Sequence, residues 1–261
     1  LNLYNMQNPH LILIAGEASG DLHGAHLVEA LKAQNPSLIF SGLGGEKMEN
    51  AGVTLVDDLT KLAVVGFVEV LKHYRKFKKI FDRTLEHIRR VRPAAVIFID
   101  YPGFNLRLAR EVKKLDIKTI YYISPQVWAW KKNRVFAIQR DIDKMLVIFK
   151  FEEDFYQRFG IKVSYVGHPL IDEIQHLIPK EKIYGQLQLD ENKLTLGLLP
   201  GSRVKEIERH MPLLLQTAAY LKAKYPMMQF VLIKAPTIER RLLDNYLKDI
   251  SIFFVIWSIL C

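Results

Sequence analysis

The chain has 261 residues, of which 49% are hydrophobic and 25% charged, and its formal net charge is +9. This composition is ordinary for a globular protein and argues against disorder, and the length suits one large or two modest domains. The one cysteine, Cys261, excludes an intramolecular disulfide framework and favours a reducing compartment. No apolar run approaches the ~20 residues that a membrane-spanning helix needs.

Short apolar runs alternate with helix-like segments along the chain. We expect strands at 11–15, 38–42, 95–99, 118–123, 144–149, 163–166, 194–199 and 229–234, and helices at 21–34, 67–91, 103–115 and 204–224. Short buried strands separated by helices indicate parallel βαβ units covered on both faces. The predicted fold class is therefore α/β with parallel sheets.

The stretch 167–192 is polar and irregular, and a new strand–loop–helix start follows it at Leu194. We predict a complete Rossmann-like domain over residues 1–168. Residues 169–261 are predicted to form a linker and the incomplete start of a second domain, because the rest is shorter than the ~100–150 residues of a typical domain.

The first strand runs into the loop Gly16-Glu17-Ala18-Ser19-Gly20-Asp21. Its spacing does not match the glycine-rich dinucleotide motif, and it lacks the lysine of a phosphate-binding loop. Its two carboxylates would repel a pyrophosphate but suit sugar hydroxyls, to which they offer acceptors. The alternative is structural, with Ser19 or Asp21 capping a helix that begins near Leu22.

Ligands of open parallel sheets gather outside the carboxyl ends of the strands, where two more motifs lie. Asp100 directly follows the apolar strand 95–99, where burial would raise its pKa and suit it to act as a general base, or it caps the next helix. Asn105 would line the same pocket. In the loop after strand 118–123, Trp128 and Lys131 offer a stacking face and a cation, although tryptophans also pack in cores.

The second strand–loop start carries no acid, and Gly201, Ser202 and Arg203 precede a helix. Backbone N–H groups, the helix dipole and a guanidinium together suit a diphosphate.

Residues 61–92 hold ten Lys or Arg against three acids, an excess of seven positive charges. The segment is also amphipathic, so it is either a membrane-surface helix or a solvated basic one. If it is a membrane-surface helix, we expect the residues in contact with the membrane to be Val65, Phe67, Val68, Leu71, Arg75, Lys76 and Lys79. The histidines form no metal-binding pattern, so we expect no metal.

Seven stretches resemble the lipid-A-disaccharide synthase family, which are glycosyltransferases of the GT-B fold. They are GEASGD (16–21), LAVVGFVEVL (62–71), IDYPGFN (99–105), IKTIYYISPQVWAWKKNRV (117–135), FEEDFY (151–156), YVGHPL (165–170) and LLPGSR (198–203). The resemblance runs from about residue 11 to 240. Past about residue 249 the sequence leaves the family pattern, and the ending SIFFVIWSILC is expected to be aberrant.

The resemblance implies an inverting transfer from a UDP-2,3-diacylglucosamine donor to 2,3-diacylglucosamine-1-phosphate, giving the lipid A disaccharide and UDP. It places Asp100 on the family's essential aspartate and Arg203 on its essential arginine, at the donor diphosphate. Glu17 and Ser19 would join Asp100 as catalytic residues, and Asp21 would bind substrate hydroxyls. No cofactor is implied.

The same resemblance implies a cytoplasmic protein, peripheral on the cytoplasmic face of the inner membrane, with no nucleic-acid partner. The expected protein partner is either a second copy of this chain, in a homodimer, or a separate polypeptide that supplies the C-terminal half. Two alternatives stay open: a truncated remnant that binds membrane or acceptor lipid without catalysis, and another GT-B enzyme such as a UDP-sugar epimerase.

Overall fold

The computed structural model describes residues 8–60, 74–174, 178–248 and 254–258. The chain divides into two compact units, Leu1–Ile174 and Gln175–Cys261. The predicted boundary at 168/169 lies close to this division. Binding of acceptor and membrane by the first part, and of the nucleotide sugar by the second, remain predictions.

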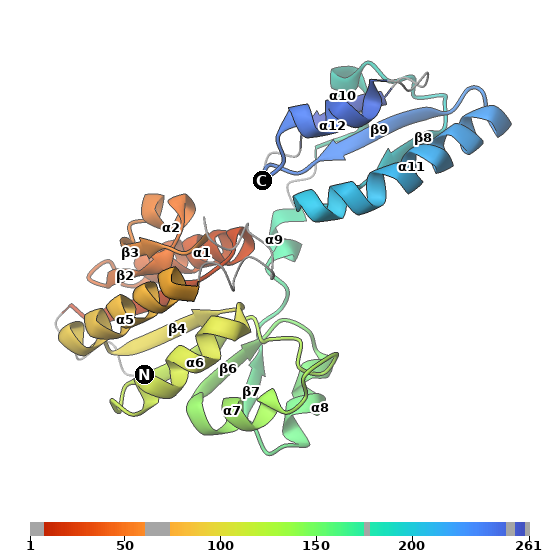
Figure 1. Ribbon diagram of the computed structural model, residues 1–261. Helices are drawn as coiled ribbons and strands as arrows, with labels where there is room; N and C mark the ends of the chain where they lie inside the picture. Colours follow the sequence, from red (N-terminus) through yellow and green to blue (C-terminus); the bar gives the residue numbers. More distant parts are fainter. Residues whose placement is uncertain (1–7, 61–73, 175–177, 249–253, 259–261) are drawn as a thin grey trace. The chain divides into compact units, whose positions relative to one another are not determined.

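In the described part of the first unit, seven parallel strands form one sheet in the order β3-β2-β1-β4-β5-β6-β7 (Figure 1). The strands are β1 (His10–Ala15), β2 (Ile39–Gly44), β3 (Thr54–Asp58), β4 (Ala95–Ile99), β5 (Lys118–Tyr122), β6 (Lys144–Val147) and β7 (Val163–Tyr165). The central strand β4 is buried along its whole length, as expected of a parallel sheet covered on both faces. The edge strand β3 was not predicted, because its second half, Val56–Asp58, mixes one apolar residue with two acids.

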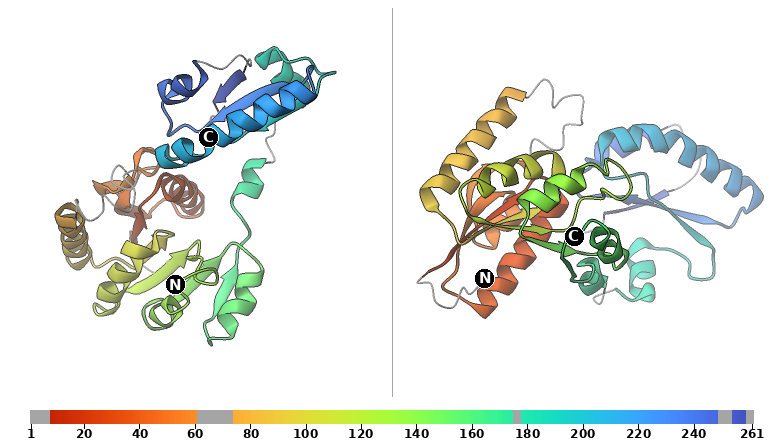
Figure 2. Two further views of the ribbon diagram at one scale, coloured as in Figure 1. Left: turned by 45° about the vertical axis from the view of Figure 1, so that its right-hand side comes forward. Right: turned by 90° about the horizontal axis from the view of Figure 1, so that it is seen from below.

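Helices cover both faces of this sheet (Figure 2). They are α1 (Ala18–Gln34), α2 (Glu46–Asn50), α5 (Tyr74–Val91), α6 (Pro102–Lys113), α7 (Arg134–Asp141) and α8 (Phe151–Gln157), and the short helix α9 (Leu170–Ile174) follows β7 at the end of the unit. Apolar side chains of α1 and α2 pack with one face of the strands, and those of α5, α6, α7 and α8 pack with the other. These two cores hold the strand ends at fixed positions.

In the described part of the second unit, the parallel strands β8 (Thr195–Leu198), β9 (Gln229–Lys234) and β10 (Phe254–Ser258) lie in the order β10-β9-β8. Its helices are α10 (Lys180–Leu187), α11 (Val204–Lys224) and α12 (Arg240–Leu247). Residues of β8, β9, α11 and α12 form a separate hydrophobic core. Within the ending that was expected to be aberrant, residues 254–258 form a strand that pairs in parallel with β9, as their β-branched and aromatic side chains favour.

Candidate functional site

The site expected in the first unit lies where the strand order of the sheet reverses. β1 pairs on one side with β2 and on the other with β4, so the connections leaving β1 and β4 diverge to opposite faces. Ala15 and Ile99 are register partners at the carboxyl ends of these strands. The residues that follow them, Gly16 and Asp100, therefore begin the two loops at the switch point, which is where α/β sheets bind their ligands. This adjacency could not be read from the sequence.

Gly16 allows the two loops to approach each other. A Cβ at this position would lie 2.3 Å from a ring carbon of Tyr101, so any other residue would displace that ring. Burial raises the pKa of the Tyr101 phenol, and the negative charge of Glu17 raises it further. Glu17 of the first loop and Tyr101 of the second thus share one environment, and the phenol stays protonated at neutral pH.

Asp100 and Tyr101 are both left-handed, with φ of 43° and 47°. Neither is glycine, and such a conformation costs an ordinary residue about 1–2 kcal/mol. Strained backbone of this kind is concentrated at functional sites, which fits the role expected of Asp100. Asp100 precedes α6, and Tyr101 rather than Asp100 is its N-cap residue. The alternative that Asp100 caps the helix is therefore not supported.

Asn105 lies under this strained turn rather than on its surface. It is fully buried, and its Nδ2 donates to the carbonyl of Asp100 at 2.7 Å and to that of Ile99 at 3.2 Å. Its Oδ1 is buried and has no partner among the described residues. The hydrogen bonds of Asn105 Nδ2 to Ile99 and Asp100 connect it to the turn that carries Asp100, and its contact with substrate stays a prediction.

The side chain of Asp21 is engaged in the scaffold. Its carboxylate is 5% exposed and accepts the backbone N–H groups of Gly45, Lys47 and Met48 at 2.7, 3.1 and 3.0 Å. These groups begin α2, so Asp21 caps that helix instead of binding sugar hydroxyls or starting its own helix.

The helix α1 begins at Ala18, earlier than predicted, with Glu17 in the N-cap position. Ser19 therefore lies in the first turn of α1. Of the loop's two acids, one is engaged in the scaffold and Glu17 remains at the switch point.

The loop after β5 places its two tryptophans differently. Trp128 packs edge-on against Phe151 with 4.9 Å between the ring centroids, and its Nε1 is buried with no partner among the described residues. Trp130 is 55% exposed, and the Nζ of Lys131 lies 4.9 Å from its ring centroid. The core-packing alternative therefore fits Trp128 and not Trp130.

A buried carboxylate holds the start of this loop. Glu152 of α8 is 1% exposed, accepts the hydroxyl of Ser124, and accepts the backbone N–H of Phe149 at 3.1 Å. Glu152 lies within FEEDFY, and nothing in that pattern separates it from the acids Glu153 and Asp154 beside it, so its role could not be predicted.

In the second unit, Gly201, Ser202 and Arg203 lie between β8 and α11, as predicted. Gly201 has φ of 128°, which favours glycine, and a Cβ there would lie 2.6 Å from Glu206 Cβ. Glu206 Oε2 accepts the N–H of Ser202 at 2.9 Å, and its Oε1 accepts from Arg203 Nη1 at 3.1 Å. These hydrogen bonds hold the pKa of Glu206 below its ordinary value. The carboxylate of Glu206 thus accepts hydrogen bonds from Ser202 and Arg203, the same donors that are expected to bind a diphosphate.

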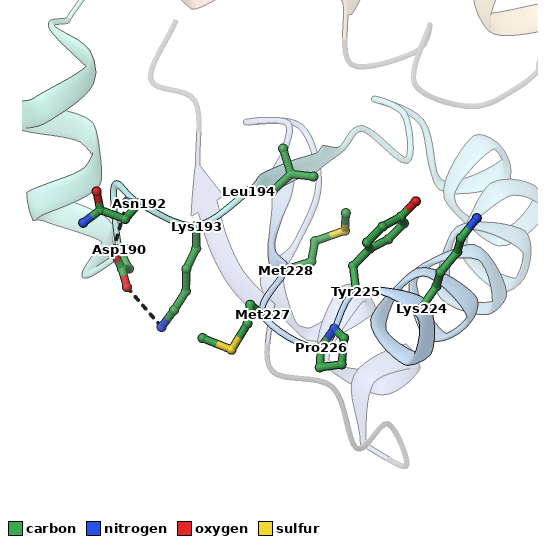
Figure 3. A pocket seen from close by; sticks show the side chains of 9 residues that line it. All are labelled: Asp190, Asn192, Lys193, Leu194, Lys224, Tyr225, Pro226, Met227 and Met228. Carbon is green, nitrogen blue, oxygen red and sulfur yellow. Dashed lines mark hydrogen bonds and ion pairs between the residues drawn. The ribbon is translucent and has the colours of Figure 1, made fainter.

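Each unit has a hollow in its described part. The hollow of the second unit, of about 560 Å³, is lined by Asp190, Asn192, Lys193, Leu194, Lys224, Tyr225, Pro226, Met227 and Met228 (Figure 3). It lies at the amino ends of β8 and β9, opposite the loop of Arg203, and has no part in the predicted site. The hollow of the first unit, of about 350 Å³, includes Tyr122, His168 and Asp172 at the carboxyl ends of the strands.

The membrane residues are only partly described. Val65, Phe67, Val68 and Leu71 lie outside the described residues. Arg75, Lys76 and Lys79 are exposed on α5, whose other side packs on the sheet. Among the described helices none has the length and apolar character to cross a membrane. The same residues contain no cluster of three or more His, Cys, Asp or Glu suited to a metal.

The fold and the placement of these loops define the class of the protein as GT-B-like α/β. A UDP-N-acetylglucosamine 2-epimerase of Listeria monocytogenes superposes with a TM-score of 0.66 at 12% identity, covering 98% of this chain and 70% of that one. At this identity the likeness shows the fold alone. It confirms the predicted fold class.

The family follows from the sequence. A family model described as lipid-A-disaccharide synthetase matches residues 11–256, and the chain belongs to that family. It is 45% identical over 240 residues to lipid-A-disaccharide synthase 1 of Legionella pneumophila (strain Lens), covering 92% of this chain and 62% of that protein. It is 42% identical over 227 residues to the synthase of Coxiella burnetii (strain Dugway 5J108-111), covering 87% and 60%. The chain thus spans about 60% of the length of these relatives, and the match extends past residue 249, where the resemblance was expected to end.

Proposed function

We propose that this chain carries the acceptor side, and part of the donor side, of a lipid A disaccharide glycosyltransferase. The observation that carries the proposal is the place of Asp100 at the switch point of the sheet in a chain of this family. The donor is UDP-2,3-diacylglucosamine and the acceptor is 2,3-diacylglucosamine-1-phosphate.

In the proposed reaction, Asp100 accepts the proton of the acceptor's 6-hydroxyl as its oxygen attacks the anomeric carbon of the donor. The new C–O bond forms as the bond to the diphosphate breaks on the opposite face, so the configuration inverts and UDP leaves. Glu17 and Ser19 bind sugar hydroxyls beside Asp100. Trp128 packs within the loop, and Lys131, whose Nζ lies 4.9 Å from the ring centroid of the exposed Trp130, supplies a cation beside that ring.

Binding of the leaving diphosphate is assigned to residues of the second unit. Gly201 lets the backbone turn tightly, and the N–H of Ser202 and the guanidinium of Arg203 are donors that suit a diphosphate. This assignment requires Glu206 to release them. No cofactor enters the reaction.

The exposed cations of α5 support docking on an anionic membrane surface, which is where lipid substrates of this kind would lie. We therefore place the protein on the cytoplasmic face of the inner membrane, with no nucleic-acid partner. A complementing C-terminal polypeptide or a homodimer are its proposed protein partners.

A turnover assay tests the proposal. The purified chain is given both lipids in detergent micelles, alone and with the C-terminal half of a full-length relative, beside Asp100→Asn. Disaccharide formed by the wild type and lost in Asp100→Asn is expected. Product only with the added half identifies a split enzyme. No product under either condition would overturn catalysis and leave the alternative, a chain that binds acceptor lipid or membrane without turnover.

A further inference from the structure

The strained peptide at Asp100 is held by two buried side chains. Its carbonyl oxygen accepts a hydrogen bond from Asn105 Nδ2 at 2.7 Å and another from the Tyr121 hydroxyl. Both side chains are 0% exposed. A carbonyl at the end of a strand ordinarily meets water or a neighbouring backbone N–H, so two buried side-chain donors on one oxygen indicate that its direction is fixed.

Tyr121 reaches this oxygen from the neighbouring strand. It lies in β5 as the register partner of Phe98, and the two rings are 6.1 Å apart between centroids. Its ring is therefore anchored in the core while its hydroxyl extends past the end of β4. The N–H of Asp100 donates to Tyr122 O at 3.2 Å, so β5 engages both polar backbone groups of Asp100.

We propose that Tyr121 is a positioning residue, which together with Asn105 holds Asp100 in its left-handed conformation and so sets the direction of its carboxylate. The inference rests on the proposed function, because it concerns the base of that reaction. Tyr121 acts through the backbone of Asp100 and touches no substrate.

The Tyr121 hydroxyl is suited to act as a permanent hydrogen-bond donor to the Asp100 carbonyl. Burial raises its pKa well above the ordinary value, and the charge of Asp100 raises it further. The phenol is therefore protonated throughout the pH range in which an enzyme works, and it does not titrate as an acid of the reaction. Removing the hydroxyl leaves Asn105 as the one described side chain on this carbonyl.

The test compares Tyr121→Phe with Tyr156→Phe. Tyr156 is also 0% exposed, belongs to the same core, and donates its hydroxyl to a backbone carbonyl, that of Pro125. Each variant thus removes one buried hydroxyl that is bonded to backbone. Two readouts are used: amide hydrogen exchange of the segment 100–105, which needs no turnover, and steady-state kinetics of the chain in the condition that gives product.

We expect Tyr121→Phe to speed exchange of residues 100–105 and to lower kcat by about tenfold to a hundredfold with little change in KM, because a displaced base impairs the chemical step. Tyr156→Phe should change neither. In an Asp100→Asn background, Tyr121→Phe should have no further effect on the residual rate, because its effect passes through Asp100.

Three results would overturn the inference: unchanged exchange in Tyr121→Phe, an unchanged kcat, or a loss equal to that of Tyr156→Phe. If the wild type shows no turnover even with the added half, the proposed function fails and the positioning role fails with it. The exchange measurement then still decides whether Tyr121 restrains the turn, so the two failures are told apart.

Discussion

The carboxylate of Asp21 in α1 accepts the backbone N–H of Gly45 at 2.7 Å, across 24 positions of sequence. The same carboxylate accepts two further N–H groups at the start of α2, so one side chain connects the helix after β1 to the helix after β2. The second acid of the motif GEASGD therefore serves the scaffold, while Glu17 stays near Tyr101.

Asp21→Asn is expected to destabilise the first unit by about 2 kcal/mol, because its amide group cannot accept all three N–H bonds and a buried donor is left without a partner. Chemical denaturation measures the change. Glu49→Gln, an exposed acid of α2, is the control and should cost little. Normal stability in Asp21→Asn together with weaker substrate binding would restore the substrate role that the sequence indicated.

Asp100→Gly is expected to raise stability while it abolishes turnover. Glycine adopts a positive φ without strain, so the folded state gains about 1 kcal/mol at this position. Thermal unfolding should show a midpoint higher by a few degrees. Asp116→Gly is matched to it, because Asp116 is also left-handed, with φ of 56°, but lies exposed on a loop. It should gain similar stability and leave turnover intact. A loss of stability in Asp100→Gly would show that the Asp100 side chain contributes more to the fold than its strain removes.

The positions of the candidate site residues could be predicted from the sequence, but the contacts between them could not. Asp100 and Arg203 could be proposed from the sequence because both follow apolar strands, and strand ends are recognisable from hydrophobic runs. The pairing of β1 with β4, which brings Gly16 beside Tyr101, depends on strand order, which no local pattern carries. The hydrogen bond of Tyr121 to Asp100 could not be predicted, because a tyrosine within a strand is ordinarily expected to pack in the core. Its hydroxyl reaches the Asp100 carbonyl only because of the register of β5 with β4.

In the second unit, too, the sequence motif predicts the residues of a site but not their contacts. The motif LLPGSR predicts an anion site from its own residues, but the internal carboxylate that fills it lies three residues after Arg203, in α11. A glutamate at that position is also what the third residue of a capped helix supplies, and Glu206 accepts the backbone N–H of the N-cap residue Arg203 at 3.3 Å. A sequence pattern does not separate a capping residue from one that competes with a ligand, because the same N–H groups serve both.

Glu206→Gln is expected to bind inorganic pyrophosphate more tightly than the wild type, by about threefold to tenfold, because the charged competitor for Ser202 and Arg203 is removed. The same variant should lower the thermal midpoint, since the group that accepts the N–H bonds of Ser202 and Arg203 at the start of α11 loses its charge. Isothermal titration and thermal unfolding give the two readouts. Glu208→Gln removes an equal charge from an exposed position of the same helix. An equal gain in Glu208→Gln would show that net charge, and not competition by Glu206 for these donors, sets the affinity for pyrophosphate.

Reversing three charges on α5 is expected to weaken binding to vesicles that contain phosphatidylglycerol. The variant Arg75→Glu/Lys76→Glu/Lys79→Glu removes exposed cations from one helix, and the loss should be roughly tenfold or more at low salt. Vesicle sedimentation measures it. The control, Lys118→Glu/Lys144→Glu/Lys162→Glu, changes the net charge equally at exposed positions elsewhere in the first unit. Equal losses in both variants would mean that overall charge, and not this helix, attracts the membrane.

Stability is expected to fall as the pH drops below about 6.5, through a chain of hydrogen bonds at the amino ends of β1 and β2. Ser41 lies between His10 and His87, with 2.8 Å from its Oγ to each Nε2. Arg90 donates to Nδ1 of His87, so His87 carries its proton on Nε2 and donates to Ser41, whose hydroxyl donates to His10. In this arrangement both imidazoles are neutral.

Burial lowers the pKa of both histidines, and for His87 the nearby positive charge of Arg90 lowers it further. The unfolded chain therefore takes up protons at a higher pH than the folded one, and stability is lost as pH falls through the unfolded value of 6.5, levelling off below the folded pKa values. Denaturation midpoints at about pH 7.5 and about pH 5.5 should differ clearly in the wild type. In His10→Gln/His87→Gln the difference should shrink, while an undiminished difference would place the acid sensitivity in other groups.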